Sequence, residues 1–118
     1  MIKKENVIQE KSFQFALKVI GLYKILQEQR EYIISKQLLR SATSIGANVQ
    51  ESSAAFSRKD FIYKISISSK EARETKYWLS LLQESDLVEI ELKEYINDVE
   101  ELIRILTAIV KSSQVQSN

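Results

Sequence analysis

The sequence predicts an all-α fold in which four helices pack as an antiparallel bundle. The chain of 118 residues contains no proline and only two glycines, so little in it would interrupt a helix or form a β-turn. Four long segments space their apolar residues three or four positions apart, which is the period of an amphipathic helix. We expect helices over about residues 7–29, 36–54, 58–84 and 91–112 of a single domain.

The composition indicates a core that needs no covalent support. With 44% hydrophobic residues, a chain of this length can fold without disulfides or a structural metal. It has no cysteine, which excludes thiol chemistry and favours a reducing, cytoplasmic location. Lys11, Lys18 and Lys24 interrupt the first apolar segment, so we expect neither a signal peptide nor a membrane span.

Charge is distributed unevenly along the chain. Residues 1–83 carry 14 Lys or Arg against 8 Asp or Glu, whereas residues 84–118 carry 3 against 8. This asymmetry has two interpretations: a basic surface for an anionic partner, or an acidic helix that lies beside a basic one. We favour the second, because the total charge of +1 is low for a nucleic-acid-binding domain.

The first helix, with Asn6 or Ser12 as a candidate N-cap, has more apolar surface than one bundle seam requires. Its apolar residues cover an arc of roughly 180° in helical projection. One face should enter the core and the other should contact a second copy of the chain. The residues on this arc are Phe13, Phe15, Ala16, Val19, Ile20, Leu22, Tyr23 and Leu26.

The second helix, with Ser35 as its candidate N-cap, combines an apolar stripe with a surface of small uncharged residues. The stripe consists of Leu38, Ala42, Ile45 and Val49. Gly46 lies within this helix at a cost of about 1 kcal/mol relative to alanine, which indicates the close approach of another helix.

The third helix has the best-defined start in the sequence. Ser57 and Asp60 have the spacing of an N-cap and an N3 residue, and Phe56 and Phe61 have the spacing of a hydrophobic staple over the same cap. The predicted seam then alternates strictly between intervals of four and three, as in antiparallel bundles. It consists of Phe61, Ile65, Ser68, Ala72, Thr75, Leu79 and Leu82.

The outer side of the third helix interleaves cations with phenol rings along one line. If the protein binds nucleic acid, we expect these residues to do so, because cations can follow a phosphate backbone and rings can stack on unpaired bases. The alternative is a solvated face whose Lys and Arg stems cover the rings. The candidates are Lys59, Tyr63, Lys70, Arg73 and Tyr77.

The fourth helix has a wide apolar seam and an acidic first half. The seam consists of Leu92, Tyr95, Val99, Leu102, Leu106 and Ile109. Acidic residues near the start and Lys111 near the end match the helix macrodipole. We expect the polar tail 112–118 to fray.

The sequence offers no catalytic constellation. The absence of histidine excludes the Glu-x-x-His pattern of di-iron bundles, and neither a nucleophile with its base nor a glycine-rich phosphate loop is present. Glu71 and Glu74 form a Glu-x-x-Glu near Glu51, and we interpret them as surface or interface carboxylates that pair with an arginine such as Arg40, Arg58 or Arg73. We therefore expect no enzyme activity, no cofactor and no metal.

A polar motif on the second helix has two interpretations. It could be a ligand or partner site, or a hydrogen-bonded network that fixes how the helices pack. We favour the packing network, because Ser and Asn lie there at helical spacing on a small-residue surface. The motif consists of Arg40, Ser41, Ser44, Asn48 and Glu51.

Several of these stretches together resemble one family. They are Lys11-Ser-Phe, residues 37–51, residues 57–61 and residues 70–79. The chain is similar over nearly its whole length to the four-helix-bundle proteins of 23S rRNA intervening sequences. The resemblance implies an up-down-up-down bundle that assembles into a ring, typically a pentamer, without established enzymatic activity. A basic relative of the same broad fold is the accessory variability determinant of diversity-generating retroelements, which binds a reverse transcriptase and nucleic acid.

Three functions are compatible with these observations: an oligomeric interaction scaffold, a nucleic-acid-binding accessory protein, and an enzyme with a carboxylate site. We favour the scaffold, whose partner is the chain itself, and keep the accessory protein with an RNA or nucleoprotein partner as the alternative. The candidate subunit contacts are Phe15, Leu22, Ile67, Glu71, Glu74, Trp78 and Leu81.

Overall fold

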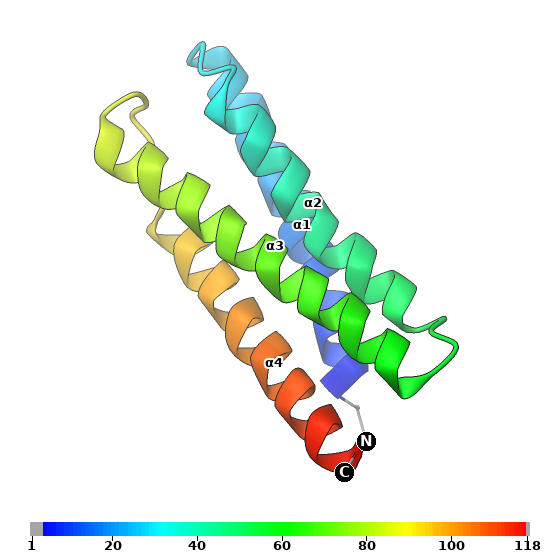
Figure 1. The fold of residues 1–118 in the computed structure, drawn as a ribbon. Coiled ribbons are helices and arrows are strands. Elements are labelled where there is room, and N and C mark those ends of the chain that lie inside the picture. Colours follow the sequence, from blue (N-terminus) through cyan, green and yellow to red (C-terminus); the bar gives the residue numbers. More distant parts are fainter. Residues whose placement is uncertain (1–3, 118) are drawn as a thin grey trace.

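The computed structural model describes residues 4–117, which form four α-helices. These are α1 (Lys4–Glu28), α2 (Ile34–Ser52), α3 (Arg58–Ser85) and α4 (Lys93–Ser117). The predicted all-α four-helix bundle is therefore confirmed (Figure 1).

Each helix packs against two of the others. The contacting pairs are α1 with α2, α2 with α3, α3 with α4, and α1 with α4, and the diagonal pairs do not contact one another within the described residues. The α1–α2 and α3–α4 connections lie at one end of the bundle, and the α2–α3 turn lies at the other, near the start of α1 and the end of α4 (Figure 1). The first and last helices are thus neighbours in space.

The core consists of the apolar stripes that the spacing predicts. On α2 the predicted stripe from Leu38 to Val49 is buried, and on α3 the buried positions run from Ile65 to Leu82 at the predicted intervals. Phe61 and Tyr95 are only half-buried and pack against this core. The helical period alone identified most of the interior, because a bundle buries one stripe of each helix.

The connection between α1 and α2 differs from the prediction. The amides of Arg30 and Glu31 donate to the carbonyl oxygens of Gln27 and Leu26 at 2.9 Å each, the two bonds of a Schellman motif, with Arg30 in the left-handed conformation (φ 65°). Glu31 then caps α2, because its carboxylate accepts from the amides of Ile34 at 2.9 Å and Ser35 at 2.6 Å.

Three predicted N-caps are therefore wrong. Ser35 lies inside α2, where its buried hydroxyl donates to the carbonyl of Glu31 at 2.7 Å. Helix α1 already begins at Lys4, so Asn6 and Ser12 lie within it. Ser35, and either Asn6 or Ser12, are candidates in the sequence because their side chains suit a cap, but the preceding residues extend the helical pattern.

The turn between α2 and α3 confirms the cap and corrects the staple. The Ser57 side chain accepts a hydrogen bond from the Asp60 amide at 3.0 Å, and α3 begins at the next residue, as predicted. The Asp60 carboxylate accepts from the Phe56 amide at 3.3 Å. The Phe56 ring is fully exposed, so the predicted staple with Phe61 does not form.

The fourth helix is displaced toward the C-terminus relative to its predicted bounds. It follows Asp86, which is left-handed (φ 60°), and begins at Lys93, whose amide donates to the Glu91 carboxylate at 3.0 Å. It continues to Ser117, so the expectation that the tail frays from Ser112 is wrong for the part of the tail that the structure describes. Buried Ser113 extends the inward stripe past Ile109 by one more turn.

Candidate functional site

The structure places the predicted cationic and aromatic line on the outside of α3. Its five residues, Lys59, Tyr63, Lys70, Arg73 and Tyr77, are all exposed. No ion pair engages the three cations within the described residues. The Tyr77 ring packs edge-on against the ring of Trp78, with centroids 5.2 Å apart. The line is thus accessible, and a role in nucleic-acid binding stays a prediction.

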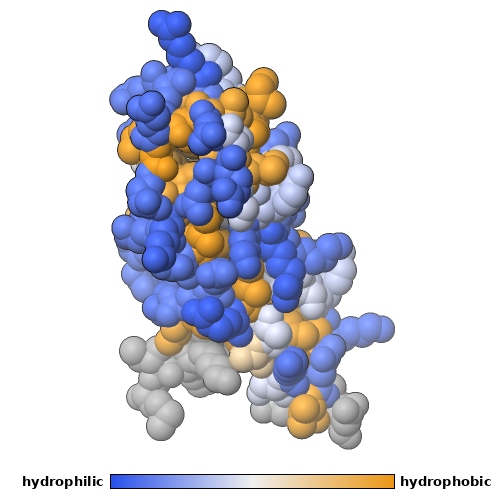
Figure 2. All heavy atoms as spheres, turned by 90° about the vertical axis from the view of Figure 1, so that its left-hand side faces the viewer, coloured by the Kyte–Doolittle hydropathy of each residue, from blue (hydrophilic) through white to orange (hydrophobic). Residues whose placement is uncertain are grey.

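A hollow of about 380 Å³ lies beside this line, between α3 and α4. It is lined by Arg73 and Lys76 from α3 and by Glu100, Ile103 and Arg104 from α4. Lys76 and Glu100 form an ion pair across it at 3.0 Å. Figure 2 views the bundle from the side on which α4 lies in Figure 1, and apolar side chains there emerge between hydrophilic ones along the bundle. The sequence alone does not predict this hollow, because its lining residues come from two different helices.

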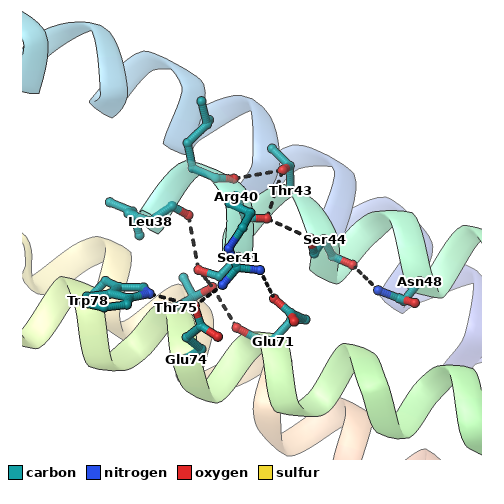
Figure 3. A network of polar contacts seen from close by, with 11 residues as sticks. Leu38, Arg40, Ser41, Thr43, Ser44, Asn48, Glu71, Glu74, Thr75 and Trp78 are labelled. Atoms are coloured by element: carbon teal, nitrogen blue, oxygen red, sulfur yellow. Dashed lines mark hydrogen bonds and ion pairs between the residues drawn. The ribbon is translucent and has the colours of Figure 1, made fainter. Parts of the chain in front are cut away.

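A second polar cluster connects α2 to α3 (Figure 3). The Arg40 guanidinium contacts the carboxylates of Glu71, at 3.2 Å, and Glu74. The Trp78 indole N–H donates to the same Glu74 oxygen that binds Arg40, at 2.9 Å. The predicted pairing of Glu71 and Glu74 with an arginine is therefore confirmed, and of the three candidate arginines Arg40 contacts both carboxylates.

The pKa values of this cluster follow from these contacts. The hydrogen bond from Trp78 lowers the pKa of Glu74, with a further contribution from Arg40, and together they outweigh the opposing effect of burial. The hydrogen bond to Glu74 raises the pKa of Arg40. Both groups stay charged at neutral pH, as a structural ion pair requires.

The buried part of the contact between α2 and α3 rests on hydroxyl groups. The Thr75 hydroxyl donates to Oγ of Ser41 at 2.8 Å and lies equally far from the carbonyl oxygen of Glu71. The Ser68 hydroxyl donates to the Ile45 carbonyl, also at 2.8 Å, across the helix contact. Ser41, Ser68 and Thr75 are completely buried. These bonds require a close and specific approach of the two helices.

The predicted polar motif is only partly a network between helices. Arg40 and Ser41 reach α3, and Glu51 binds Lys64 of α3 at 2.9 Å. Ser44 and Asn48 instead donate to carbonyl oxygens one turn earlier on α2, at 2.7 and 2.8 Å. For these two residues the interpretation as packing contacts is wrong, because their side chains form hydrogen bonds within α2 itself.

The candidate subunit contacts divide into two groups. Phe15 and Leu22 are buried in the core of the single chain, so the prediction that they contact another subunit is wrong. Ile67, Glu71, Glu74, Trp78 and Leu81 each keep part of their surface exposed. Their role at a subunit contact stays a prediction.

The outward face of α1 is formed by other apolar residues. Phe13 is 59% exposed, Leu17 48% and Ile20 39%. These residues lie three or four positions apart and therefore on one side of the helix. The apolar excess of the first helix predicts this face, although Leu17 is not among the residues of the predicted arc.

The acidic fourth helix binds cations of the first and third helices. Lys18 of α1 binds Glu94 at 2.6 Å and also Asp98, and Lys11 binds Glu101 at 3.2 Å. Burial lowers the pKa of Lys18, but the hydrogen bonds and charges of Asp98 and Glu94 raise it above its ordinary value on balance. The favoured interpretation of the charge asymmetry, an acidic helix beside a basic one, is confirmed.

The described residues contain neither a membrane-spanning helix nor a cluster suited to a metal ion. Between residues 4 and 117, no helix is long and apolar enough to cross a membrane. The same residues contain no group of three or more acidic, histidine or cysteine side chains arranged to hold a metal ion.

Comparisons with known proteins agree on one family. Residues 4–108 match the family model of the 23S rRNA-intervening sequence proteins. A crystal structure of a protein of unknown function from the S23 ribosomal protein family of Bacteroides thetaiotaomicron is 47% identical, with a TM-score of 0.88. The match covers 92% of this chain and 99% of that one. No curated protein matches significantly. The chain belongs to the family of 23S rRNA-intervening sequence proteins.

Proposed function

We propose that the protein is a non-enzymatic scaffold, an up-down-up-down antiparallel bundle that assembles with copies of itself into a ring. The observation that supports this most directly is the outward face of α1, defined by Phe13, Leu17 and Ile20. Fully burying one such side chain contributes about 1.5–3 kcal/mol. An exposed apolar cluster of this kind marks an interaction site more often than a solvated surface.

A ring requires two different surfaces on each subunit, because a contact of a surface with itself closes at a dimer. The bundle offers two such surfaces. One is the outward face of α1, and the other is the flank of α3 with Ile67, Trp78 and Leu81. Helices α1 and α3 lie diagonally in the bundle and do not contact each other within the described residues, so the two surfaces face different directions. The expectation of five subunits rests on the family resemblance.

Light scattering combined with size exclusion tests assembly directly. The wild-type protein should be larger than a monomer at micromolar concentration, and a monomer would contradict the proposal. Leu17→Glu and Leu81→Glu should each weaken assembly and keep the helical circular dichroism spectrum, because a charge desolvated in a contact is costly. Gln50→Glu, an exposed position on α2, is the matched control and should leave the mass unchanged.

Mixing the two variants tests the ring geometry. Each variant retains the surface that the other lacks, so a contact between different surfaces should allow them to form a one-to-one dimer. If α1 contacts only α1 of another subunit, Leu81→Glu should still form dimers with itself, whereas Leu17→Glu should stay monomeric and should not join them, and the ring would be excluded.

The second candidate is a nucleic-acid-binding accessory protein, such as a reverse-transcriptase partner in a diversity-generating retroelement. It is supported by the three exposed cations of the α3 line, Lys59, Lys70 and Arg73, and by their unpaired state among the described residues. Replacing Lys70 and Arg73 together by glutamate should weaken RNA binding and flatten its salt dependence. Unchanged affinity at two salt concentrations would remove this candidate. Either function fits a cytoplasmic location, which the absence of cysteine favours.

A further inference from the structure

We propose that the hollow between α3 and α4 binds a phosphate group, held by the guanidinium groups of Arg73 and Arg104. This site goes beyond the scaffold function and does not depend on it. The hollow uses Arg73 and Lys76 of α3, whereas the two surfaces proposed for assembly are the outward face of α1 and the flank of α3 with Ile67, Trp78 and Leu81.

The charges around the hollow do not cancel. Three of its five lining residues are cations and one is a carboxylate, so the net charge is +2. Glu100 is already paired with Lys76 at 3.0 Å. Arg73 and Arg104 are exposed and form no ion pair or hydrogen bond with the side chains described between residues 6 and 115. Two guanidinium groups therefore keep all their N–H donors available at one place.

The sequence around each arginine explains why it stays unpaired. Glu100 precedes Arg104 by one helical turn, a spacing that normally favours an ion pair on α4 itself. Lys76 of α3 takes this carboxylate instead. Arg73 has Lys70 and Lys76 at the positions three residues away and no acidic residue four residues away. Arg40 makes a useful contrast, because the contact between α2 and α3 places it against two glutamates.

Phosphate suits this arrangement better than a carboxylate does. The planar guanidinium binds two oxygens of one group in parallel, and phosphate has enough oxygens for two such groups. Half-buried Ile103 forms an apolar part of the wall and reduces the water around the bound oxygens, which strengthens the attraction. The phosphate could belong to a free phosphorylated compound or to the backbone of a nucleic-acid strand.

Titration of the full-length protein with inorganic phosphate, followed by amide and arginine side-chain NMR signals, tests the site. We expect the largest shifts at Arg73, Lys76 and Arg104. Arg73→Glu and Arg104→Glu should each abolish these shifts, and Arg104→Lys should retain part of them. Glu100→Gln should increase the affinity, because it removes the one negative charge among the described residues that line the hollow.

The matched control is Lys36→Glu, which makes the same charge change at an exposed residue on α2. It should leave phosphate binding unchanged. Equal losses from Lys36→Glu and Arg104→Glu would show that only net charge matters and would overturn the site. Absence of any saturable shift at Arg73 and Arg104, with phosphate and with RNA, would also overturn it.

A short single-stranded RNA distinguishes the two sources of the phosphate. If a strand is the ligand, RNA should bind more tightly than phosphate, and Arg104→Glu should reduce the slope of log affinity against log salt by about 0.7 for each lost contact. If a free compound is the ligand, RNA should bind no more tightly than phosphate. Lys70→Glu changes the α3 line but not the hollow. If this variant weakens RNA binding and leaves phosphate binding unchanged, the α3 line binds RNA separately from the hollow.

Discussion

The α2–α3 contact and the α1–α4 contact hold the bundle together in different ways. Between α2 and α3 the fully buried polar groups are hydroxyls, and Ser68 and Thr75 bond directly across the contact, with the ion pairs of Arg40 at its edge. Between α1 and α4 the polar groups are long charged side chains near the surface, such as Lys18 with Glu94 and Asp98. Short hydroxyls bond only at one register and one close distance, whereas long ion pairs adapt to small shifts. The α2–α3 pair should therefore fix the geometry of the bundle, and the α1–α4 pair should close it.

The largest expected effect is that of added volume at Ser68. Its hydroxyl lies 2.8 Å from the α2 backbone, so the leucine of Ser68→Leu would push the two helices apart. We expect a loss of about 1–3 kcal/mol in the free energy of unfolding, measured with urea. Ser68→Ala removes only the hydrogen bond and should cost less, about 0.5–1.5 kcal/mol. Equal losses would show that close approach is not the important property.

The cap of the α2–α3 turn should have the next largest effect. Ser57→Ala removes the acceptor for the Asp60 amide, so we expect a loss of about 0.5–2 kcal/mol. Ser57→Asp keeps an acceptor at this position and should retain most of the stability. An unchanged thermal midpoint for Ser57→Ala would show that this cap contributes nothing to the α2–α3 pair.

Acid should weaken the α2–α3 contact through Glu74. Trp78 and Arg40 lower the pKa of this carboxyl below its ordinary value of 4.5, so the unfolded chain binds the proton more readily than the folded one. The stabilisation is thus complete above pH 4.5 and is lost as the pH falls through the lowered folded-state pKa. Glu74→Gln should remove this part of the pH dependence and cost no more than about 1 kcal/mol at pH 7, because solvent screens the pair. An identical acid profile for the variant would exclude Glu74 as its cause.

The smallest effect should come from the α1–α4 ion pairs. Lys18→Met removes the charge that binds Glu94 and Asp98 and that lies over the Tyr95 ring, 5.3 Å from its centroid, so we expect a loss of about 0.2–1 kcal/mol. The difference from wild type should shrink in high salt, since these groups are exposed. A loss larger than that of Ser68→Leu would reverse the proposed roles of the two contacts.

The local sequence predicts the cap in the turn before α3 but not the cap in the turn before α2. The Ser57 cap depends on residues three positions apart, so the local pattern was sufficient. The cap of α2 depends on Glu31, whose carboxylate reaches the α2 amides after Arg30 adopts the left-handed conformation. Arginine rarely signals that conformation, which usually falls to glycine or asparagine. The pattern therefore pointed to Ser35 instead.

The candidate sites also differ in whether the local sequence pattern is enough to predict them. The α3 line was predictable because its residues share one helix, and helical period alone determines that they lie together. The hollow with Arg73 and Arg104 was not, because it depends on how far α3 and α4 are shifted relative to each other. The same holds for the bond between Ser41 and Thr75, which are on different helices.

By itself, the sequence determined four helices, their inward stripes and the excess of apolar residues on the first one. Only the tertiary structure decided that Phe15 and Leu22 face the core while Phe13 and Leu17 face outward. The apolar arc of this helix is continuous, so its period cannot say which part is covered. The positions of α2 and α4 determine which part is buried, because these helices pack against one side of α1 and leave the other side open.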